Sequence, residues 1–283
     1  MSRIDLHVHS TASDGKFSPQ AVVEKAAALG LTFMALSDHD TVDGVVPALQ
    51  AAAAFPGLNL IPAVEISTDT PDGQAHVLGY FIDYTSADLA SALNRFRNSR
   101  QLRAQAMIAR LGNLGINIDW QRVQEIAGDG SVGRPHIVQA MLEKKYIESF
   151  AEAFDKYIGH GGPAYVERDK MTPEEAVELI IGSRGLPVLA HPYTVADPEK
   201  LIVSLKSAGL VGIETYYKDY NAAEIERLVD MTDRYNLVAT GGTDYHGIDD
   251  ETEVMLGGVD VPAESVERLI ALADKYALKL ANI

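Results

Sequence analysis

Apolar and polar residues alternate from Ile4 to His9, near the start of the chain. A period of two predicts a β-strand with one buried face. His7 and His9 share the polar face of this strand, about 6.6 Å apart, and can converge on one metal ion. On a helix, residues two apart diverge by roughly 200° and could not share an ion. Two ordinary strand histidines remain the alternative at this point.

Short apolar stretches alternate with helical patterns over most of the chain. Further strands are expected at 31–36, 58–67, 75–82, 186–190, 211–215 and 237–240. Helices are expected at 18–30, 42–54, 221–235 and 264–276, and two more begin at Thr172 and Asp197. This alternation predicts a parallel sheet, open or closed. Pro62 in the strand over 58–67 predicts a bend or an irregular edge there.

Helical patterns replace this alternation between about 86 and 181, with no strand expected before 164–166. The expected helices cover 86–111, 119–127, 134–145 and 149–158. We therefore predict one α/β domain made of residues 1–85 and 165–283, with a mainly helical insertion over 86–164. The insertion is the candidate for a substrate-recognition lobe.

The amino-acid composition limits the classes of protein to which this chain can belong. The chain has 283 residues, of which 47% are hydrophobic, enough for one large domain with an insertion. It has no cysteine, which excludes disulfides and thiolate metal sites. A net charge of −16 disfavours binding to long duplex nucleic acid. No run of 18 apolar residues and no signal-peptide pattern are present, so we expect no membrane span and a cytoplasmic location.

Most expected strands end at a side chain that could bind a metal ion. In a barrel of parallel strands these ends gather on one face. Alone, each residue has an ordinary explanation, such as a strand-end cap for His39 or a core histidine for His76. The set, however, takes in six of the eight histidines. Its members are His7, His9, Asp14, His39, Glu65, His76, His191, Asp244 and His246.

Nine nitrogen and oxygen ligands are too many for one ion, so a site for two or three ions is expected. Imidazole and carboxylate without thiolate suit zinc, manganese or iron better than magnesium or calcium. Gly241 and Gly242 precede Asp244 and predict a close approach of the backbone to another group.

This motif series runs in order over essentially the whole chain and resembles that of the PHP (polymerase and histidinol phosphatase) superfamily. The resemblance implies a distorted (β/α)7 barrel and two or three divalent metal ions, manganese first, with zinc and iron as alternatives. Asp5 and Asp38 are expected to orient histidines, although for Asp5 a buried hydrogen-bonding role without metal is an open alternative. The implied metal sites are His7, His9, Glu65 and Asp244 for one ion, Glu65, His76 and His191 for a second, and Asp14, His39 and His246 for a third.

In that superfamily such a centre hydrolyses phosphate esters by attack of a metal-bridging hydroxide, so the nine ligands are expected to be catalytic through their metals. The stretch from Arg95 to Arg110 holds five arginines and no acid, which favours phosphate recognition. A solvated helix face is the alternative. Arg134 and His136 open a helix, where an anion binds well; His136 as the acid for the leaving group is a further alternative.

The segments 133–136 and 161–170 resemble the branch that hydrolyses nucleoside 3′,5′-bisphosphates and trims short RNA from its 5′ end. Arg100 and Arg103, from the arginine-rich stretch, are added to the residues of these segments. The expected substrate-binding residues are Arg134, His136, Arg100, Arg103, Arg168 and Lys170.

The sequence therefore predicts a metal-dependent phosphoesterase. Its expected substrates are small phosphorylated nucleotides such as pAp, or short oligonucleotides. A histidinol-phosphate phosphatase or another small phosphomonoesterase is the first alternative. The second alternative is a non-catalytic binding module in which bound metals only stabilise the fold.

Overall fold

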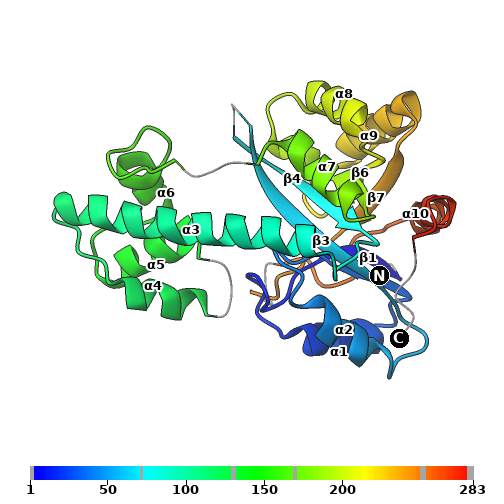
Figure 1. Cartoon of the computed structure of the whole chain (residues 1–283), viewed down its shortest axis with the longest axis horizontal. Coiled ribbons are helices and arrows are strands. Elements are labelled where there is room, and N and C mark those ends of the chain that lie inside the picture. Colours follow the sequence, from blue (N-terminus) through cyan, green and yellow to red (C-terminus); the bar gives the residue numbers. More distant parts are fainter. Residues whose placement is uncertain (1–2, 71–72, 129–131, 168–170, 249–252, 279–283) are drawn as a thin grey trace. The chain divides into compact units, whose positions relative to one another are not determined.

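A computed structural model describes residues 3–70, 73–128, 132–167, 171–248 and 253–278. The chain divides into two compact units, which are described separately (Figure 1). The first comprises residues 1–91 and 171–283, and the second residues 92–170. A role of the second unit in substrate recognition stays a prediction.

The first unit contains a seven-stranded sheet that curves into a nearly closed barrel (Figure 1). The strands follow one another in chain order around the barrel. A bridge between Val8 and Tyr245 joins the last strand to the first, and the His9 amide donates to the Tyr245 carbonyl at 2.9 Å. The strands are β1 (Ile4–Val8), β2 (Phe33–Leu36), β3 (Asn59–Thr70), β4 (Gly73–Tyr80), β5 (Leu186–Leu189), β6 (Gly212–Tyr217) and β7 (Val238–Gly242).

Strand β4 runs antiparallel to both of its neighbours, whereas the other pairs of neighbours are parallel. The expectation of a wholly parallel sheet is therefore wrong at this strand. Only residues 71 and 72 separate β3 from β4. A parallel crossover needs a dozen residues or more, so a connection of two residues dictates a hairpin. The distorted (β/α)7 barrel that the sequence predicts is otherwise confirmed.

Both faces of β1 are buried, not one as the alternation predicts. Its polar face lies inside the barrel unit, where His7 and His9 are fully buried. Pro62 is also placed differently from expectation, because β3 lies in the middle of the sheet and not at an edge. Pairing of β3 with β2 ends at Pro62 and pairing with β4 begins at Ala63, so the missing amide of Pro62 lies at the change of partner.

Helices connect the parallel strands and cover the barrel (Figure 1). Their starts follow from capping side chains: Ser18 accepts from the Ala21 amide, and Thr172 forms a reciprocal capping box with Glu175. The helices of this unit are α1 (Pro19–Ala28), α2 (Val45–Ala52), α7 (Pro173–Gly182), the 3-10 turn η2 (Pro192–Thr194), α8 (Pro198–Ala208), α9 (Ala222–Tyr235) and α10 (Ala263–Lys275).

The second unit is helical, with α3 (Ala87–Asn113) entering it from the first unit. Its other helices are α4 (Trp120–Ala127), α5 (Arg134–Glu143), α6 (Phe150–Ala153) and the π-helical turn η1 (Phe154–Ile158). Their apolar faces form a separate core that includes Met107, Leu111 and Ile137. The strand expected at 164–166 is not formed. There the Ala164 amide donates to the Tyr157 carbonyl, and the side chains pack into this core.

No helix in the described ranges is both long enough and apolar enough to cross a membrane.

Candidate metal centre

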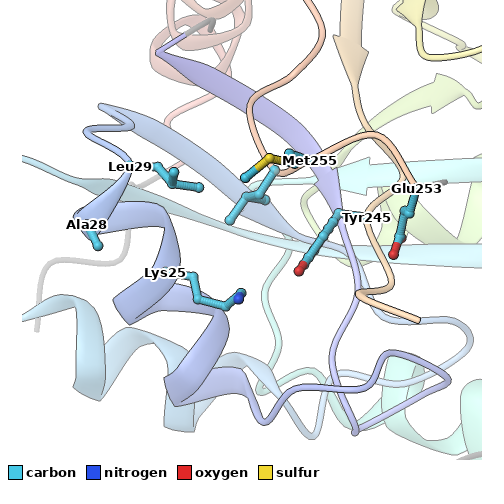
Figure 2. A pocket seen from close by; sticks show the side chains of 7 residues that line it. Lys25, Ala28, Leu29, Tyr245, Glu253 and Met255 are labelled. Carbon is cyan, nitrogen blue, oxygen red and sulfur yellow. The ribbon is translucent and has the colours of Figure 1, made fainter. Parts of the chain in front are cut away.

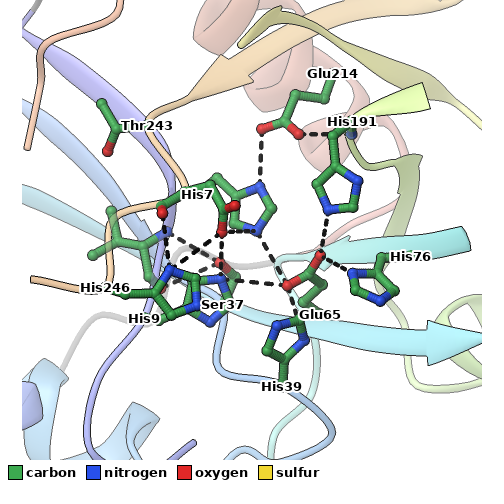
Figure 3. Close-up of polar contacts among 12 residues, drawn as sticks. His7, His9, Ser37, His39, Glu65, His76, His191, Glu214, Thr243 and His246 are labelled. Carbon is green, nitrogen blue, oxygen red and sulfur yellow. Dashed lines mark hydrogen bonds and ion pairs between the residues drawn. The ribbon is translucent and has the colours of Figure 1, made fainter. Parts of the chain in front are cut away.

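All nine predicted metal ligands belong to one cluster of close contacts centred on the buried side chain of Glu65, which β3 carries near the middle of its length. Figure 3 shows the histidines of this cluster around Glu65. The Glu65 Oε2 atom lies 3.2 Å from His7 Nε2 and 3.3 Å from His9 Nε2, both contributed by the β1 end. It also lies 3.0 Å from His39 Nδ1, which follows β2. One carboxylate oxygen thus faces three imidazoles from two neighbouring strand ends.

The second oxygen of Glu65 faces two further histidines. Its Oε1 atom lies 2.9 Å from His76 Nδ1 and 3.1 Å from His191 Nε2. His76 stands at the beginning of β4, opposite Ser67, and not at a strand end as expected. Because β4 is reversed, its beginning lies at the face where the parallel strands end.

The segment after β7 completes the cluster. Asp244 Oδ1 lies 3.1 Å from His9 Nε2 and 3.4 Å from His7 Nε2. His246 Nε2 lies 3.3 Å from Asp14 Oδ1, in the turn after β1. The Asp14 side chain is 41% exposed, whereas those of His7, His9 and Glu65 are fully buried, so the cluster opens on the Asp14 side.

Three groups of these side chains each bring one ligand atom from every member within 4.8 Å of the others. The first group has the membership that the resemblance implies for one ion. His9, His39 and Glu65 each belong to two groups, whereas His191, which lies 3.1 Å from Glu65 Oε1, is a member of none of the three. The division of ligands among ions therefore stays a prediction. The groups are His7, His9, Glu65 and Asp244; His9, Asp14, His39 and His246; and His39, Glu65 and His76.

Divalent metal ions fit this cluster. The buried atoms His7 Nε2, both ring nitrogens of His9, and Glu65 Oε2 make no hydrogen bond within the described ranges. Buried polar atoms without a partner are costly and rare in native proteins. Here they point at one another from converging strands, and a shared cation satisfies them together. A donor set of nitrogen and oxygen atoms without sulfur is one that divalent metal ions accept.

Burial opposes the charged forms of His7, His9 and Glu65, and neighbouring charges decide the direction in which each pKa shifts. Burial works to lower the pKa of His7, but the facing carboxylates, Glu214 first, outweigh it and raise that pKa well above its ordinary value. Burial and the nearby His246 lower the pKa of His9 to about 3. Burial works to raise the pKa of Glu65, but the imidazoles around it hold that pKa well below its ordinary value. The middle of the centre thus offers an ionised carboxylate and an unprotonated imidazole.

Glu214 belongs to this centre although the sequence analysis did not identify it. It lies within β6, is fully buried, and accepts from His7 Nδ1 at 2.9 Å (Figure 3). The signal in the sequence is a carboxylate inside an apolar strand. A search limited to the ends of strands does not find it. Tyr217 and Lys218, at the end of β6, were missed as well. They donate to Asp244 Oδ2 at 2.9 and 3.3 Å.

Asp5 and Asp38 hold backbone segments and hydroxyl groups, and their hydrogen bonds do not reach an imidazole in the described structure. Asp5 accepts from the Thr243 amide and hydroxyl and from the Gly257 amide, at 2.6 to 2.9 Å. Asp38 accepts from the Ser10 amide at 2.7 Å and from the Ser13 hydroxyl at 2.7 Å. The alternative weighed for Asp5, a buried hydrogen-bonding role, is the one that the geometry supports.

Gly241 and Gly242 do approach other groups closely, but these groups belong to adjacent strands. A Cβ atom on Gly242 would lie 2.5 Å from the His7 amide nitrogen, and one on Gly241 would lie 2.4 Å from the Tyr216 carbonyl oxygen. The glycines therefore let β7 fit between β6 and β1 and so bring Asp244 to the centre.

The six residues expected to bind substrate all fall within the second unit, residues 92–170. Arg103 is half-buried on α3, and Arg134 opens α5 with its guanidinium 5.2 Å from the Phe154 ring. His136 Nδ1 accepts from the Gly133 amide at 3.0 Å, so that this nitrogen caps α5. Arg168, Lys170 and the side chain of Arg100 lie outside what the structure describes.

A separate cavity of about 470 Å³ lies beside Tyr245 (Figure 2). Tyr245 is the residue between the predicted ligands Asp244 and His246. Its lining residues include Lys25, Leu29, Glu253 and Met255. None of the nine predicted ligands lines this cavity, so it is distinct from the metal centre.

This chain is similar to a family model, to proteins of known sequence and to solved structures. Residues 5–181 match the model of the PHP domain. A 3′,5′-nucleoside bisphosphate phosphatase of Chromobacterium violaceum is 32% identical over 87% of this chain and 88% of its own length. The 5′-3′ exoribonuclease Rnm of Escherichia coli is 32% identical over 86% of this chain and 84% of its own length. A solved amidohydrolase structure from Chromobacterium violaceum, with bound sulfate and no metal, superposes with a TM-score of 0.82 at 30% identity, covering 95% of this chain and 96% of that one.

Proposed function

Because this chain belongs to the PHP domain family and is a metal-dependent phosphoesterase, we propose that it releases phosphate from nucleoside 3′,5′-bisphosphates such as pAp. Trimming of short RNA from the 5′ end is the related reaction proposed for the same site. One observation carries the proposal: nine nitrogen and oxygen ligand side chains, from residues far apart in sequence, converge around Glu65 with buried ligand atoms lacking hydrogen-bond partners. The names of two relatives, a bisphosphate phosphatase and an exoribonuclease, support the substrate class.

The three groups of side chains defined above are the proposed holders of two or three divalent ions, with manganese preferred. When bound, such ions lower the pKa of a coordinated water to near neutrality and polarise a phosphoryl oxygen. Glu65 faces imidazoles on both of its oxygens and is the proposed carboxylate shared between ions. Asp14, the most exposed carboxylate of the set, lies where a substrate would enter.

The ammonium group of Lys218, in the barrel unit, places a positive charge at the edge of the metal centre. Its ammonium donates to the carbonyl oxygen and Oδ2 of Asp244, and its side chain is 19% exposed. A charge held in this way stabilises negative charge on a nearby phosphoryl group without reorganisation of the side chain. We assign it to the phosphate that is cleaved.

The second phosphate of a bisphosphate needs positive charge of its own. The stretch from Arg95 to Arg110 provides five arginines, and α5 adds Arg134 at its N-terminus, where the helix dipole also favours an anion. Arginine binds phosphate through two parallel hydrogen bonds. A small monoester such as histidinol phosphate would use fewer of these cations, so this alternative ranks second.

The first test compares phosphate release from pAp, 5′-AMP and histidinol phosphate by manganese-loaded protein. We expect release from pAp and none above background from 5′-AMP. His7→Ala should abolish the activity because it removes a ligand of the first group. Arg134→Ala should lower kcat/KM for pAp roughly 30-fold, equivalent to about 2 kcal/mol for a charge-assisted hydrogen bond.

Arg122→Ala is the matched control, because Arg122 lies in the same unit and pairs with Glu143 and Glu125 on the surface. Its kcat/KM should stay within about twofold of wild type, since exposed ion pairs contribute little. Cleavage of histidinol phosphate with pAp untouched would favour the monoesterase alternative. Bound metal with no hydrolysis of any ester would favour the non-catalytic module.

A further inference from the structure

Glu214 connects two metal ligands that come from opposite ends of the sequence. Its Oε1 atom lies 2.9 Å from His7 Nδ1, and its Oε2 atom accepts from the His191 amide at 2.8 Å (Figure 3). The side chain is fully buried in β6. It is not a member of any of the three ligand groups. Its two oxygens are therefore occupied by protein donors, one on each side.

The contact with His7 fixes which ring nitrogen can bind metal. An ionised carboxylate only accepts hydrogen bonds, so the proton of the facing imidazole stays on Nδ1. When the ring carries a single proton, as a metal ligand must, the lone pair is then on Nε2, the atom that lies 3.2 Å from Glu65 Oε2 and 3.4 Å from Asp244 Oδ1. The ring is thus both oriented and held in the tautomer that presents Nε2 to an ion.

The contact with His191 fixes a backbone conformation. His191 has φ 24° and ψ 63°, a region that side-chain-bearing residues rarely adopt. This conformation turns the chain from β5 into η2 and directs His191 Nε2 to Glu65 Oε1 at 3.1 Å. A hydrogen bond from the strained residue's own amide to a buried carboxylate offsets part of the cost of this conformation.

We propose that Glu214 is a positioning residue that locks His7 and His191 at once, coupling the ligands of two metal ions through one carboxylate. This inference rests on the metal-holding role proposed above. It requires two acceptor atoms, one for each donor, at opposite ends of one rigid group. A glutamine has the same shape but offers one acceptor and one donor.

Glu214→Gln is therefore the discriminating substitution. If its oxygen accepts from the His191 amide, its NH₂ group faces His7 Nδ1 and moves the imidazole proton to Nε2. If its oxygen accepts from His7, its NH₂ group faces the His191 amide, and the backbone at His191 must shift. Either orientation removes one ligand, so affinity for metal should fall by about 10- to 100-fold.

The measurement is a titration of the full-length, chelator-stripped chain with Zn²⁺ against a chromophoric competitor. Wild type, Glu214→Gln and the control Thr232→Val are compared. Thr232 is also buried, lies on α9, belongs to none of the three ligand groups, and loses one hydrogen bond, to the Val229 carbonyl. We expect weaker binding only in Glu214→Gln. Glu214→Asp keeps the charge but lacks the reach to span both donors, so it should weaken binding as well.

A spectroscopic readout separates positioning from a general loss of structure. In the zinc-loaded wild type, ¹H–¹⁵N spectra of labelled histidine should show an exchange-protected Nδ1 proton that disappears in His7→Gln. Glu214→Gln should lose or shift this signal while keeping the wild-type far-UV circular dichroism. Unchanged zinc affinity and an unchanged Nδ1 proton in Glu214→Gln would overturn the inference. Failure of wild type itself to bind zinc would instead overturn the metal-holding role.

Discussion

At the scale of single residues, a ligand such as Asp244 directs one polar atom toward the other ligands. Neighbouring residues hold its second polar atom by hydrogen bonds. Asp244 presents Oδ1 to His7 and His9, while Tyr217 and Lys218 occupy its Oδ2. Burial, and then the charge of Asp244, raise the pKa of Tyr217 well above its ordinary value. The phenol is therefore a neutral hydrogen-bond donor over the whole working range of pH. Asp244 is left with one oxygen for an ion.

Tyr217→Phe tests this arrangement. The substitution removes the hydroxyl that donates to Asp244 Oδ2 and leaves the ring in place. We expect about tenfold weaker metal binding, because the carboxylate can rotate, and a stability loss of about 1 kcal/mol. Tyr216→Phe is the control, since that ring packs against the apolar core. Equal metal affinities of the two variants in the Zn²⁺ titration would contradict a role for the Tyr217 hydroxyl.

The sequence singles out the side chains that converge in the centre, because metal chemistry restricts candidate ligands to a few residue types at strand ends. It does not predict their supports, because a carboxylate inside a strand, such as Glu214, has the same local pattern whether it meets solvent or a histidine. Asp38 illustrates the same limit. Its neighbour His39 suggests an orienting role, yet Asp38 holds Ser10 and Ser13, which lie 25 or more positions away.

At the scale of elements, β7 is the strand on which closure of the barrel depends. Gly242→Ala would place a Cβ atom 2.5 Å from the His7 amide nitrogen and 2.9 Å from Asp5 Oδ1. Both neighbours are fixed by hydrogen bonds in the buried sheet. We expect a loss of about 1 to 3 kcal/mol in the free energy of unfolding, together with weaker metal binding. Urea unfolding followed by circular dichroism measures the first quantity.

Gly57→Ala is the matched control, because a Cβ atom at that position would meet nothing within 4 Å. Its stability should equal or slightly exceed that of wild type, since alanine restricts the unfolded chain. If both glycine variants unfold at the same urea concentration, the packing account of β7 is wrong.

Element positions follow from the sequence wherever local signals mark them. The capping box at Thr172 places the start of α7 correctly, because its hydrogen bonds span only three residues. The direction of β4 does not follow from the local pattern, because the alternation with helices elsewhere favours parallel pairing. The local pattern at 164–166 predicts a strand, but these residues pack into the helical core, and that packing depends on residues distant in sequence.

At the scale of the whole molecule, the proposed metals should stabilise the barrel unit in particular. A ligand at a hundred times its dissociation constant adds about 2.7 kcal/mol to the free energy of unfolding. The chain's single tryptophan, Trp120, lies in the helical unit. Circular dichroism reports on the strands and helices of both units. In this signal we expect Mn²⁺ to raise the midpoint of thermal unfolding by several degrees. The transition followed by Trp120 fluorescence should shift by less.

Equal shifts in the two signals would contradict the proposal that the helical segment is a domain of its own. The sequence predicts this division from the interruption of the strand–helix alternation. It does not predict the exact boundary, because α3 continues from one unit into the other without a break.

The central claim is that side chains distributed from His7 to His246 hold the divalent ions that hydrolyse the ester. Its most direct test is elemental analysis and phosphate release from pAp on the same samples of wild type and Glu65→Gln. Wild type should retain two or three ions per chain and cleave pAp, and Glu65→Gln should lose both properties. Wild-type protein stripped of all transition metal that still cleaves pAp at the full rate would contradict the account.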